Sequence, residues 1–222
     1  MYKAIIFDFD YTLGDSTNGI VACVNYALET LGLKKQEEQA IRKTIGLTLK
    51  DTYKTLTSTE DDAEAEKFRT LFVRKADEVM VPNTVLYDGV KEILQKLRDK
   101  GYKIGIVTTK FGYRIRDIFT RFDALPLLDL IVGGDDVKVE KPSPEGLLYA
   151  IHNFGLSKSE VLYVGDSIVD AKTAENAGVD FAAVLTGTTM KVDFSDYPSV
   201  CIGEKLSDVF DYIDLLGNGN YS

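Results

Sequence analysis

The sequence predicts an α/β protein with a doubly wound, parallel-sheet (Rossmann-like) core and an inserted all-helical cap domain. Five short apolar runs recur along the chain, and the first four are followed by helix-like sequence, which is typical of strands covered on both faces. From Asp8 to the second run at Lys103 lie roughly 95 residues, whereas a βαβ unit needs only about 30. The long first interval therefore predicts an insertion.

The apolar runs are expected to be strands because each is short, rich in aliphatic residues and closed by a polar residue. In chain order they are Lys3–Asp8, Lys103–Thr108, Leu128–Val132, Val161–Asp166 and Phe181–Leu185. Apolar residues at helical spacing predict helices at Val90–Leu97 and Pro144–Ile151. Ser143 is suited to be the N-cap of the second helix, with Pro144 at its first position.

The inserted segment is expected to be helical and to form a small cap at about Thr17–Val81. One helix ends near Gly32, and a longer one is expected from Thr59 to about Met80. Residues 1–16 and 82–222 then form the core domain, and residues 17–81 form the cap.

Composition and charge limit the possible partners. The 222 residues are 45% hydrophobic and 27% charged, which excludes collagen-like, low-complexity and disordered classes. The net charge of −9 disfavours nucleic acid and anionic membrane as partners. No apolar stretch approaches the ~18 residues of a membrane span, and no signal peptide is recognised, so a cytoplasmic location is expected. Cys23 and Cys201 are expected to be buried free thiols.

Polar residues gather where the predicted strands end. Parallel strands place their carboxyl ends at one edge of the sheet, and ligands bind beyond that edge. The residues found there are Asp8, Asp10, Thr108, Thr109, Lys141, Asp166 and Asp170. Carboxylates beside hydroxyl and ammonium groups describe a phosphate site that holds Mg²⁺, because Mg²⁺ prefers hard oxygen ligands.

Four ordered motifs carry a resemblance to a known family. DFDYTLGDS begins at Asp8, VTTK at Val107, KPSPEGL at Lys141 and GDSIVD at Gly165. Together they resemble the motifs of haloacid dehalogenase superfamily hydrolases, and the helical insertion resembles the cap of the phosphoglycolate phosphatase-like branch. Two positions depart from the pattern, since Tyr11 and Gly14 stand where Gly and an apolar residue are common.

The resemblance implies a role for each carboxylate. Asp8 is the implied nucleophile, forming an aspartyl-phosphate, and Asp10 the implied acid and base. Mg²⁺ is the implied cofactor, bound by Asp8, the backbone carbonyl of Asp10 and Asp166. Asp170 belongs to the same implied metal site, where it orients a metal-bound water or Lys141.

The resemblance also implies substrate contacts. Thr108 and Lys141 are expected to hold the phosphoryl oxygens. The remaining candidates for substrate binding are Phe9, Thr109 and Arg42. For Arg42 a solvated helix face is the competing interpretation, and Lys110 is expected to be either a solvated loop charge or a phosphate contact.

The predicted function is that of a Mg²⁺-dependent phosphomonoesterase acting on a small, phosphoglycolate-like phosphorylated metabolite. Because Asp10 is present, phosphate-ester chemistry is favoured over dehalogenation. A sugar phosphomutase of the β-phosphoglucomutase type, a pyrophosphatase and a nucleotidase of the same superfamily remain open alternatives. A phospho-acceptor receiver is disfavoured by the long insertion after the first strand, and a catalytically silent binding protein by the presence of both Asp8 and Asp10. The physiological substrate and the oligomeric state are not assigned.

Overall fold

The computed structural model describes residues 1–218 and divides the chain into two compact units. The first, here called the core unit, comprises Met1–Gly14 and the chain from Leu86 onward. The second, the helical unit, is Asp15–Val85. Short strands at the connections between them, β2 (Gly14–Asp15) and β3 (Val85–Leu86), pair with each other. Among the described residues, no helix is long and apolar enough to cross a membrane.

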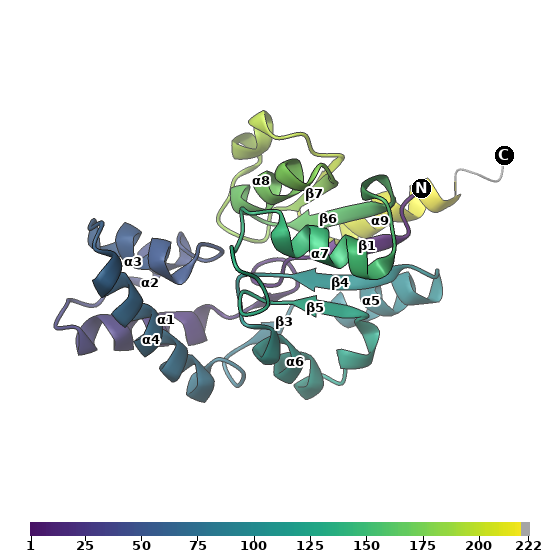
Figure 1. Cartoon of the computed structure of the whole chain (residues 1–222). Coiled ribbons are helices and arrows are strands. Elements are labelled where there is room, and N and C mark those ends of the chain that lie inside the picture. Colours follow the sequence, from purple (N-terminus) through teal and green to yellow (C-terminus); the bar gives the residue numbers. More distant parts are fainter. Residues whose placement is uncertain (219–222) are drawn as a thin grey trace. The chain divides into compact units, whose positions relative to one another are not determined.

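Six parallel strands form the sheet of the core unit (Figure 1). In spatial order they are β5 (Leu130–Val132), β4 (Lys103–Val107), β1 (Ala4–Phe7), β6 (Val161–Gly165), β7 (Asp180–Val184) and β8 (Cys201–Gly203). Numbered along the chain, this is the doubly wound order in which strand order reverses beside the first strand. The predicted fold class is confirmed.

The strand register explains why distant motifs meet. Phe7, the last residue of β1, pairs with Ile106 of β4 on one side and with Val164 of β6 on the other. The three strands therefore end close to the same level, and the residues that follow them share one edge of the sheet. The reversal of strand order between β1 and β6 opens the position where ligands bind in such sheets.

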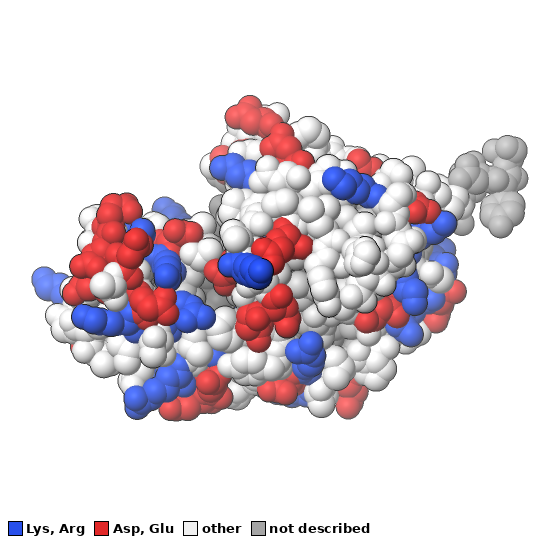
Figure 2. All heavy atoms as spheres, viewed as in Figure 1, with Lys and Arg blue, Asp and Glu red and all other residues white. Residues whose placement is uncertain are grey.

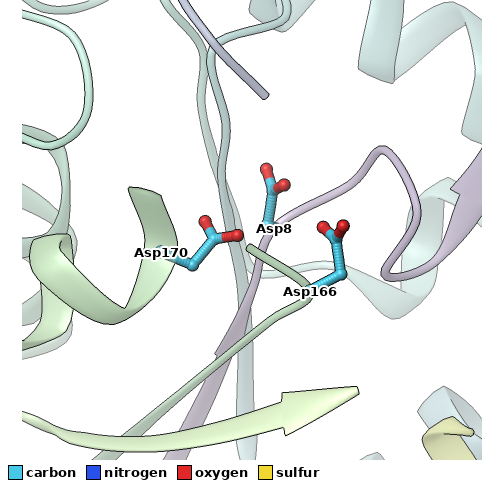
Figure 3. Close-up of side chains that lie close together, drawn as sticks. All are labelled: Asp8, Asp166 and Asp170. Carbon is cyan, nitrogen blue, oxygen red and sulfur yellow. The ribbon is translucent and has the colours of Figure 1, made fainter. Parts of the chain in front are cut away.

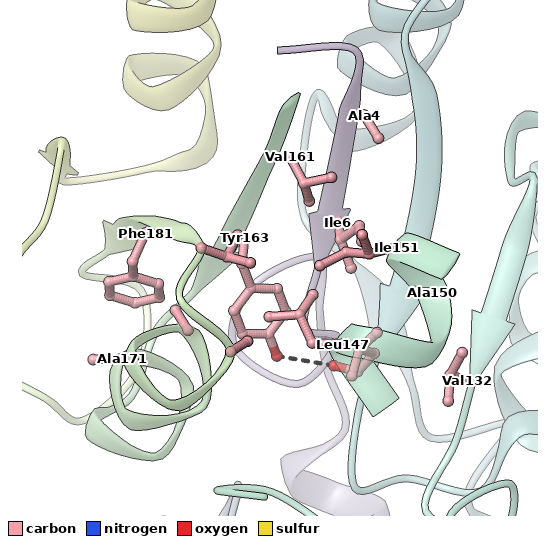
Figure 4. Packing of buried hydrophobic residues seen from close by; sticks show 14 of the residues in the cluster. Ala4, Ile6, Val132, Leu147, Ala150, Ile151, Val161, Tyr163, Ala171 and Phe181 are labelled. Carbon is pink, nitrogen blue, oxygen red and sulfur yellow. Dashed lines mark hydrogen bonds between the residues drawn. The ribbon is translucent and has the colours of Figure 1, made fainter. Parts of the chain in front are cut away.

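Helices cover both faces of this sheet (Figure 1). Their bounds are α5 (Val90–Asp99), α6 (Gly112–Arg121), α7 (Glu145–Phe154), α8 (Ile168–Ala177) and α9 (Leu206–Asn218), with short 3-10 turns at η1 (Leu125–Leu127), η2 (Lys158–Glu160) and η3 (Lys191–Asp196). On one face, α7 and α8 pack apolar residues such as Leu147 and Ala171 against Ile6 and Tyr163 (Figure 4). On the other, α5 and α9 contact each other as well as strands.

Two expectations about the core unit need correction, and two of its elements were not predicted. The helix after the third strand begins at Glu145 rather than Pro144, and the Ser143 hydroxyl accepts a hydrogen bond from the Glu145 amide. The sixth strand and α9 were not predicted, because β8 has only three residues and no long apolar run. Cys201 lies on that strand and is only half-buried, whereas Cys23 is buried as expected.

The helical unit has its own apolar core. Its helices are α1 (Thr17–Thr30), α2 (Glu38–Arg42), α3 (Leu49–Thr57) and α4 (Asp62–Val79). Phe68 is central to the core, with its ring 5.3 Å from that of Tyr53 and 6.2 Å from that of Phe72. The helix expected from Thr59 begins three residues later, because the Asp61 carboxylate caps it by accepting from two amides of its first turn.

Charged side chains are interspersed over the face shown in Figure 2, with acidic and basic groups side by side. Most ion pairs, such as Lys75 with Glu78, lie at the surface, where each contributes little to stability. A smaller group of charged residues in the core unit is instead buried. That group forms the candidate active site.

Candidate active site

Three buried carboxylates meet at the carboxyl edge of the sheet (Figure 3). Asp8 directly follows β1, Asp166 directly follows β6, and Asp170 lies in the first turn of α8. One oxygen of each lies within 4.8 Å of the others, and the residues are 2%, 5% and 0% exposed. The hydroxyl of Thr12 also donates to Oδ1 of Asp166, at 3.4 Å. The strand ends therefore bring together the carboxylates that the sequence predicted.

Lys141 is the buried cation of this cluster. Its Nζ lies 2.8 Å from Oδ1 of Asp8 and donates to Oδ1 of Asp170 at 2.6 Å. It also donates to the hydroxyl of Tyr163 at 3.2 Å. That hydroxyl lies 3.0 Å from both Oδ1 of Asp170 and the carbonyl oxygen of Val107, so it links β4, β6 and α8.

Asp170 is held at both of its oxygens. Oδ1 accepts from Lys141, while Oδ2 accepts from the hydroxyl of Ser167 at 2.5 Å and from its amide at 3.1 Å. The Ser167 hydroxyl accepts in turn from the Asp170 amide, which completes a capping box at the start of α8. The side chain that fixes Lys141 is thus itself fixed by the first turn of a helix.

Two glycines allow the carboxylates to sit where they do. A Cβ on Gly165, the last residue of β6, would overlap the carboxylate of Asp170. A Cβ on Gly187, in the loop after β7, would overlap Oδ2 of Asp166. Any other residue at either position would displace a carboxylate of the cluster.

Burial and mutual repulsion shift the ionisation of the cluster. Burial raises the pKa of Asp8 to about 6, against the opposing effect of Lys141. Burial, together with the charges of Asp170 and Asp8, raises the pKa of Asp166 well above its usual range. Burial alone would lower the pKa of Lys141, but Asp170 and Asp8 more than offset it, so the pKa is raised and the amine stays an ammonium.

The donor set fits a hard divalent cation. Asp8 and Asp166 each offer a carboxylate oxygen, and these two oxygens lie within 4.8 Å of each other. The two negative charges repel each other, and a bound cation would reduce that repulsion. Asp170 lies within the same reach, although both of its oxygens already accept hydrogen bonds from protein groups. The residues therefore suit Mg²⁺ better than a softer metal that prefers sulfur or nitrogen ligands.

Asp10 lies two residues beyond Asp8 and is paired with a second lysine. It is 8% exposed, and its Oδ2 lies 3.1 Å from Nζ of Lys110. Its Oδ1 is buried and has no hydrogen-bond partner among residues 1–218. Lys110 itself is 9% exposed, so of the two alternatives for this residue the solvated loop charge is excluded.

The remaining predicted residues differ in how close they lie to the carboxylates and in how buried they are. Thr108 follows β4 and is 5% exposed, with its hydroxyl accepting from the Lys110 amide at 3.3 Å. Thr109 is half-buried in the same loop.

The side chain of Phe9 is fully buried and packs edge-to-face on Phe119, so only its backbone is available to a ligand. Arg42 belongs to the helical unit, where its guanidinium lies 3.6 Å from Glu38, and its role in binding stays a prediction.

Tyr11 shows why its position commonly holds glycine. Its backbone has φ of 61°, in the left-handed region that favours residues without a Cβ. The side chain is nevertheless buried, its amide donates to the carbonyl of Gly14, and its own carbonyl accepts from the hydroxyl of Thr186. The loop after Asp10 is therefore held from both sides despite the departure from the pattern.

Sequence reasoning missed four residues of the site, which are Thr12, Tyr163, Ser167 and Gly187. Ser167 had a signal, because a serine three residues before an aspartate at a helix start is a capping box. Tyr163 and Gly187 had none, since a tyrosine within an apolar strand and a glycine in a loop are ordinary features.

The fold and the site define a class of protein: an open, doubly wound α/β protein with buried carboxylates and a buried lysine at the carboxyl edge of its sheet. Comparison with known proteins identifies the family. The family model described as haloacid dehalogenase-like hydrolase matches residues 5–184. The chain therefore belongs to the haloacid dehalogenase-like hydrolases, and the expected resemblance is confirmed.

Individual relatives agree with this assignment. A phosphoglycolate phosphatase from Shigella boydii is 32% identical over 215 residues, covering 83% of this chain and 82% of the relative. Pyrophosphatase PpaX from Bacillus velezensis is 31% identical over 212 residues, covering 93% and 94%. A crystal structure of a haloacid dehalogenase-like hydrolase from Bacteroides fragilis has a TM-score of 0.91 and 40% identity, covering 94% of this chain and 100% of that one.

Proposed function

We propose that this hydrolase is a Mg²⁺-dependent phosphomonoesterase that transfers the phosphoryl group of a small metabolite to Asp8 and then to water. The observation that carries the proposal is the buried contact of 2.8 Å between Asp8 and Lys141, next to Asp166. A carboxylate aligned beside a fixed ammonium can approach an anionic phosphorus, because the cation offsets the repulsion between them.

In the first step, a carboxylate oxygen of Asp8 attacks phosphorus, and the bond between phosphorus and the leaving oxygen breaks. Asp10, carrying a proton, transfers it to that oxygen, so the product leaves as a neutral hydroxyl. The hydroxyl of Thr108 and the ammonium of Lys141 hold the phosphoryl oxygens during transfer. The products are an aspartyl-phosphate at Asp8 and a free alcohol.

In the second step, water attacks the phosphorus of the aspartyl-phosphate. Asp10 now takes the proton of the water, and the bond between phosphorus and the Asp8 oxygen breaks. Inorganic phosphate leaves, and both carboxylates return to their starting forms. Dividing one displacement into two steps lowers the barrier of each.

Mg²⁺ would be held by the carboxylates of Asp8 and Asp166 and by the backbone carbonyl of Asp10. When bound, it supplies positive charge that neutralises the phosphoryl oxygens and the two carboxylates. Asp170 serves mainly to position Lys141, because both of its oxygens are engaged by the protein.

The relatives support a small phosphorylated substrate but differ in its leaving group. One is named a phosphoglycolate phosphatase and another a pyrophosphatase, at nearly equal identity. Both substrates carry a second anionic group beyond the transferred phosphoryl. Phosphoglycolate is therefore the first candidate for the phosphomonoesterase, and pyrophosphate, which is a phosphoanhydride, is the first candidate for the pyrophosphatase alternative.

The test is release of inorganic phosphate from phosphoglycolate, pyrophosphate, hexose phosphates and nucleotides, with Mg²⁺ and with a chelator. Metal-dependent release that favours one substrate is the expected result. If no compound is hydrolysed, the proposal is wrong. Conversion of β-glucose 1-phosphate in the presence of its bisphosphate would then favour the phosphomutase alternative.

A further inference from the structure

Lys110 is a buried cation that the mechanism above does not use. Its side chain is 5% exposed, and its Nζ lies 3.1 Å from Oδ2 of Asp10. The ammonium also lies 6.0 Å from the centre of the Phe9 ring, which is itself packed on Phe119. A lysine is rarely buried unless it is paired, and the partner here is the carboxylate assigned to proton transfer.

The backbone of Lys110 is fixed on both sides. Its amide donates to the hydroxyl of Thr108 at 3.3 Å, and its carbonyl accepts from the amide of Gly134 at 3.1 Å. A cation carried by a well-held loop can define the position of its partner more sharply than a mobile surface lysine can. Each of these two carboxylates therefore has its own lysine partner: Lys141 pairs with Asp8, and Lys110 pairs with Asp10.

The two oxygens of Asp10 are not equivalent. Oδ2 is paired with Lys110, whereas Oδ1 is buried without a hydrogen-bond partner in the described part of the chain. A buried polar atom left without a partner is costly, and such atoms are retained mainly where a substrate or ion completes them. Oδ1 is therefore the oxygen suited to exchange a proton with the substrate.

We propose that Lys110 is a positioning residue that anchors one oxygen of Asp10 so that the other transfers the proton to the leaving oxygen of the substrate. The inference rests on the proposed function. It differs from a phosphate-contact role, in which Lys110 would bind the transferred group of every substrate alike. Under the positioning role, its importance depends on how much the leaving oxygen needs a proton.

The experiment compares two substrates in Lys110→Met, which keeps most of the side-chain volume and removes the charge. One is the alkyl phosphate that the wild type hydrolyses best, and the other is para-nitrophenyl phosphate, whose leaving group departs without a proton. The measured quantity is kcat/KM, which reports the steps through phosphoryl transfer to Asp8. General acid catalysis contributes about 10²- to 10⁴-fold, so the expected loss is on the order of 100-fold for the alkyl phosphate and under about 10-fold for the aryl phosphate.

Three further variants make the result specific. The relevant ratio is kcat/KM for the alkyl phosphate divided by kcat/KM for the aryl phosphate, which Lys110→Met should lower. Lys110→Arg should restore part of this ratio, because it places a cation near Asp10 again. In an Asp10→Asn background, Lys110→Met should leave that ratio unchanged, since the group it positions is already gone. Lys158→Met removes an exposed charge from the turn before β6, at the opposite edge of the sheet, and should change neither kcat/KM.

The outcomes separate the inference from the proposed function. Equal losses for both substrates would overturn the positioning role in favour of a phosphate contact, and no loss for either would overturn any role at the site. If Lys110→Met is too unstable to purify, Lys110→Arg and Lys110→Gln are compared instead, and the glutamine variant should show the larger selective loss for the alkyl phosphate. Equal selectivity in the two variants would overturn the positioning role. Failure of the wild type to hydrolyse any phosphoester would overturn the proposed function and the inference with it.

Discussion

Oδ1 of Asp170 lies 2.6 Å from Nζ of Lys141, and this contact ties the first turn of α8 to the cation beside Asp8. Because Oδ2 of Asp170 is held by Ser167, the position of Lys141 depends on a helix start rather than on the loop that carries it. The position of the proposed phosphoryl site therefore depends on the junction between β6 and α8.

Asp8→Asn should reduce turnover by at least about 10⁴-fold, because a carboxamide cannot act as the nucleophile and residues that act as a unit lose nearly all activity together. Phosphate release and mass spectrometry of acid-quenched protein check this, since the wild type should gain one phosphoryl group that the variant lacks. The exposed Asp117→Asn is the matched control. Near-normal turnover by purified Asp8→Asn would disprove the proposed mechanism.

Asp166→Ala should remove the response to Mg²⁺, because it deletes a carboxylate that we assign to the metal. In the wild type and in Asp117→Asn, Mg²⁺ should raise the melting temperature as any ligand of the native state does. Thermal melts with Mg²⁺ or chelator measure this without relying on activity. A variant that keeps the wild-type shift would exclude Asp166 from the metal site.

Gly187→Ala should mimic the loss of Asp166. The added methyl group would overlap Oδ2 of that residue and turn its carboxylate away from Asp8. Activity should fall at least about 10-fold, and the Mg²⁺ requirement should move to higher concentration. Gly217→Ala on α9, where the new Cβ meets only the Tyr102 hydroxyl at 3.6 Å, is the control. Unchanged Mg²⁺ dependence in Gly187→Ala would contradict the close approach.

Tyr163→Phe should weaken both stability and activity. It removes the hydroxyl that accepts from Lys141 and donates to the Val107 carbonyl, so both buried groups lose a hydrogen bond. Such a loss costs about 1 to 3 kcal/mol of unfolding free energy, and a less firmly held Lys141 should reduce kcat. Urea denaturation and phosphate release measure the two effects, with the exposed Tyr149→Phe as the control. Equal behaviour of the two variants would show that the Tyr163 hydroxyl has no such role.

The stability of the metal-free protein should depend on pH through Asp8. Its pKa is about 6 in the folded state and 3.8 in the unfolded chain, so folding favours the protonated form. This contribution is fully present below about pH 4 and is lost as the pH rises through 6, a change of about 3 kcal/mol. Asp166 shifts in the same direction.

Denaturation in chelator from pH 4 to 7.5, with Asp8→Asn as the reference, isolates this effect. The unfolding free energy of the wild type minus that of the variant should fall as the pH rises. A difference that is constant, or that rises with pH, would contradict the raised pKa of Asp8.

Much of the fold and of the site was predictable from local pattern. Each strand of the central sheet except β8 reads as an apolar run, and Asp8, Thr108 and Asp166 directly follow such runs. Because parallel strands end at one edge of a sheet, the order of the motifs along the chain was enough to gather these residues.

Other features depend on which strands are neighbours. The sequence left Lys110 open between a solvated loop charge and a phosphate contact. The pairing of β4 with β1 brings its ammonium instead to Asp10. Gly187 matters to the site only because the loop after β7 lies against the carboxylate of Asp166. Tyr163 matters because its hydroxyl, on β6, accepts from Lys141.

The sequence by itself therefore determined the class of fold, the presence of a helical insertion and the identity of the main carboxylates, since these follow from short-range periodicity and residue type. The tertiary structure alone decided how the carboxylates are partnered: Lys141 with Asp8 and Asp170, and Lys110 with Asp10. The physical reason is that an ion pair depends on distances of a few ångströms between residues far apart in the chain. Strand register and helix packing set those distances, and residue order does not encode them locally.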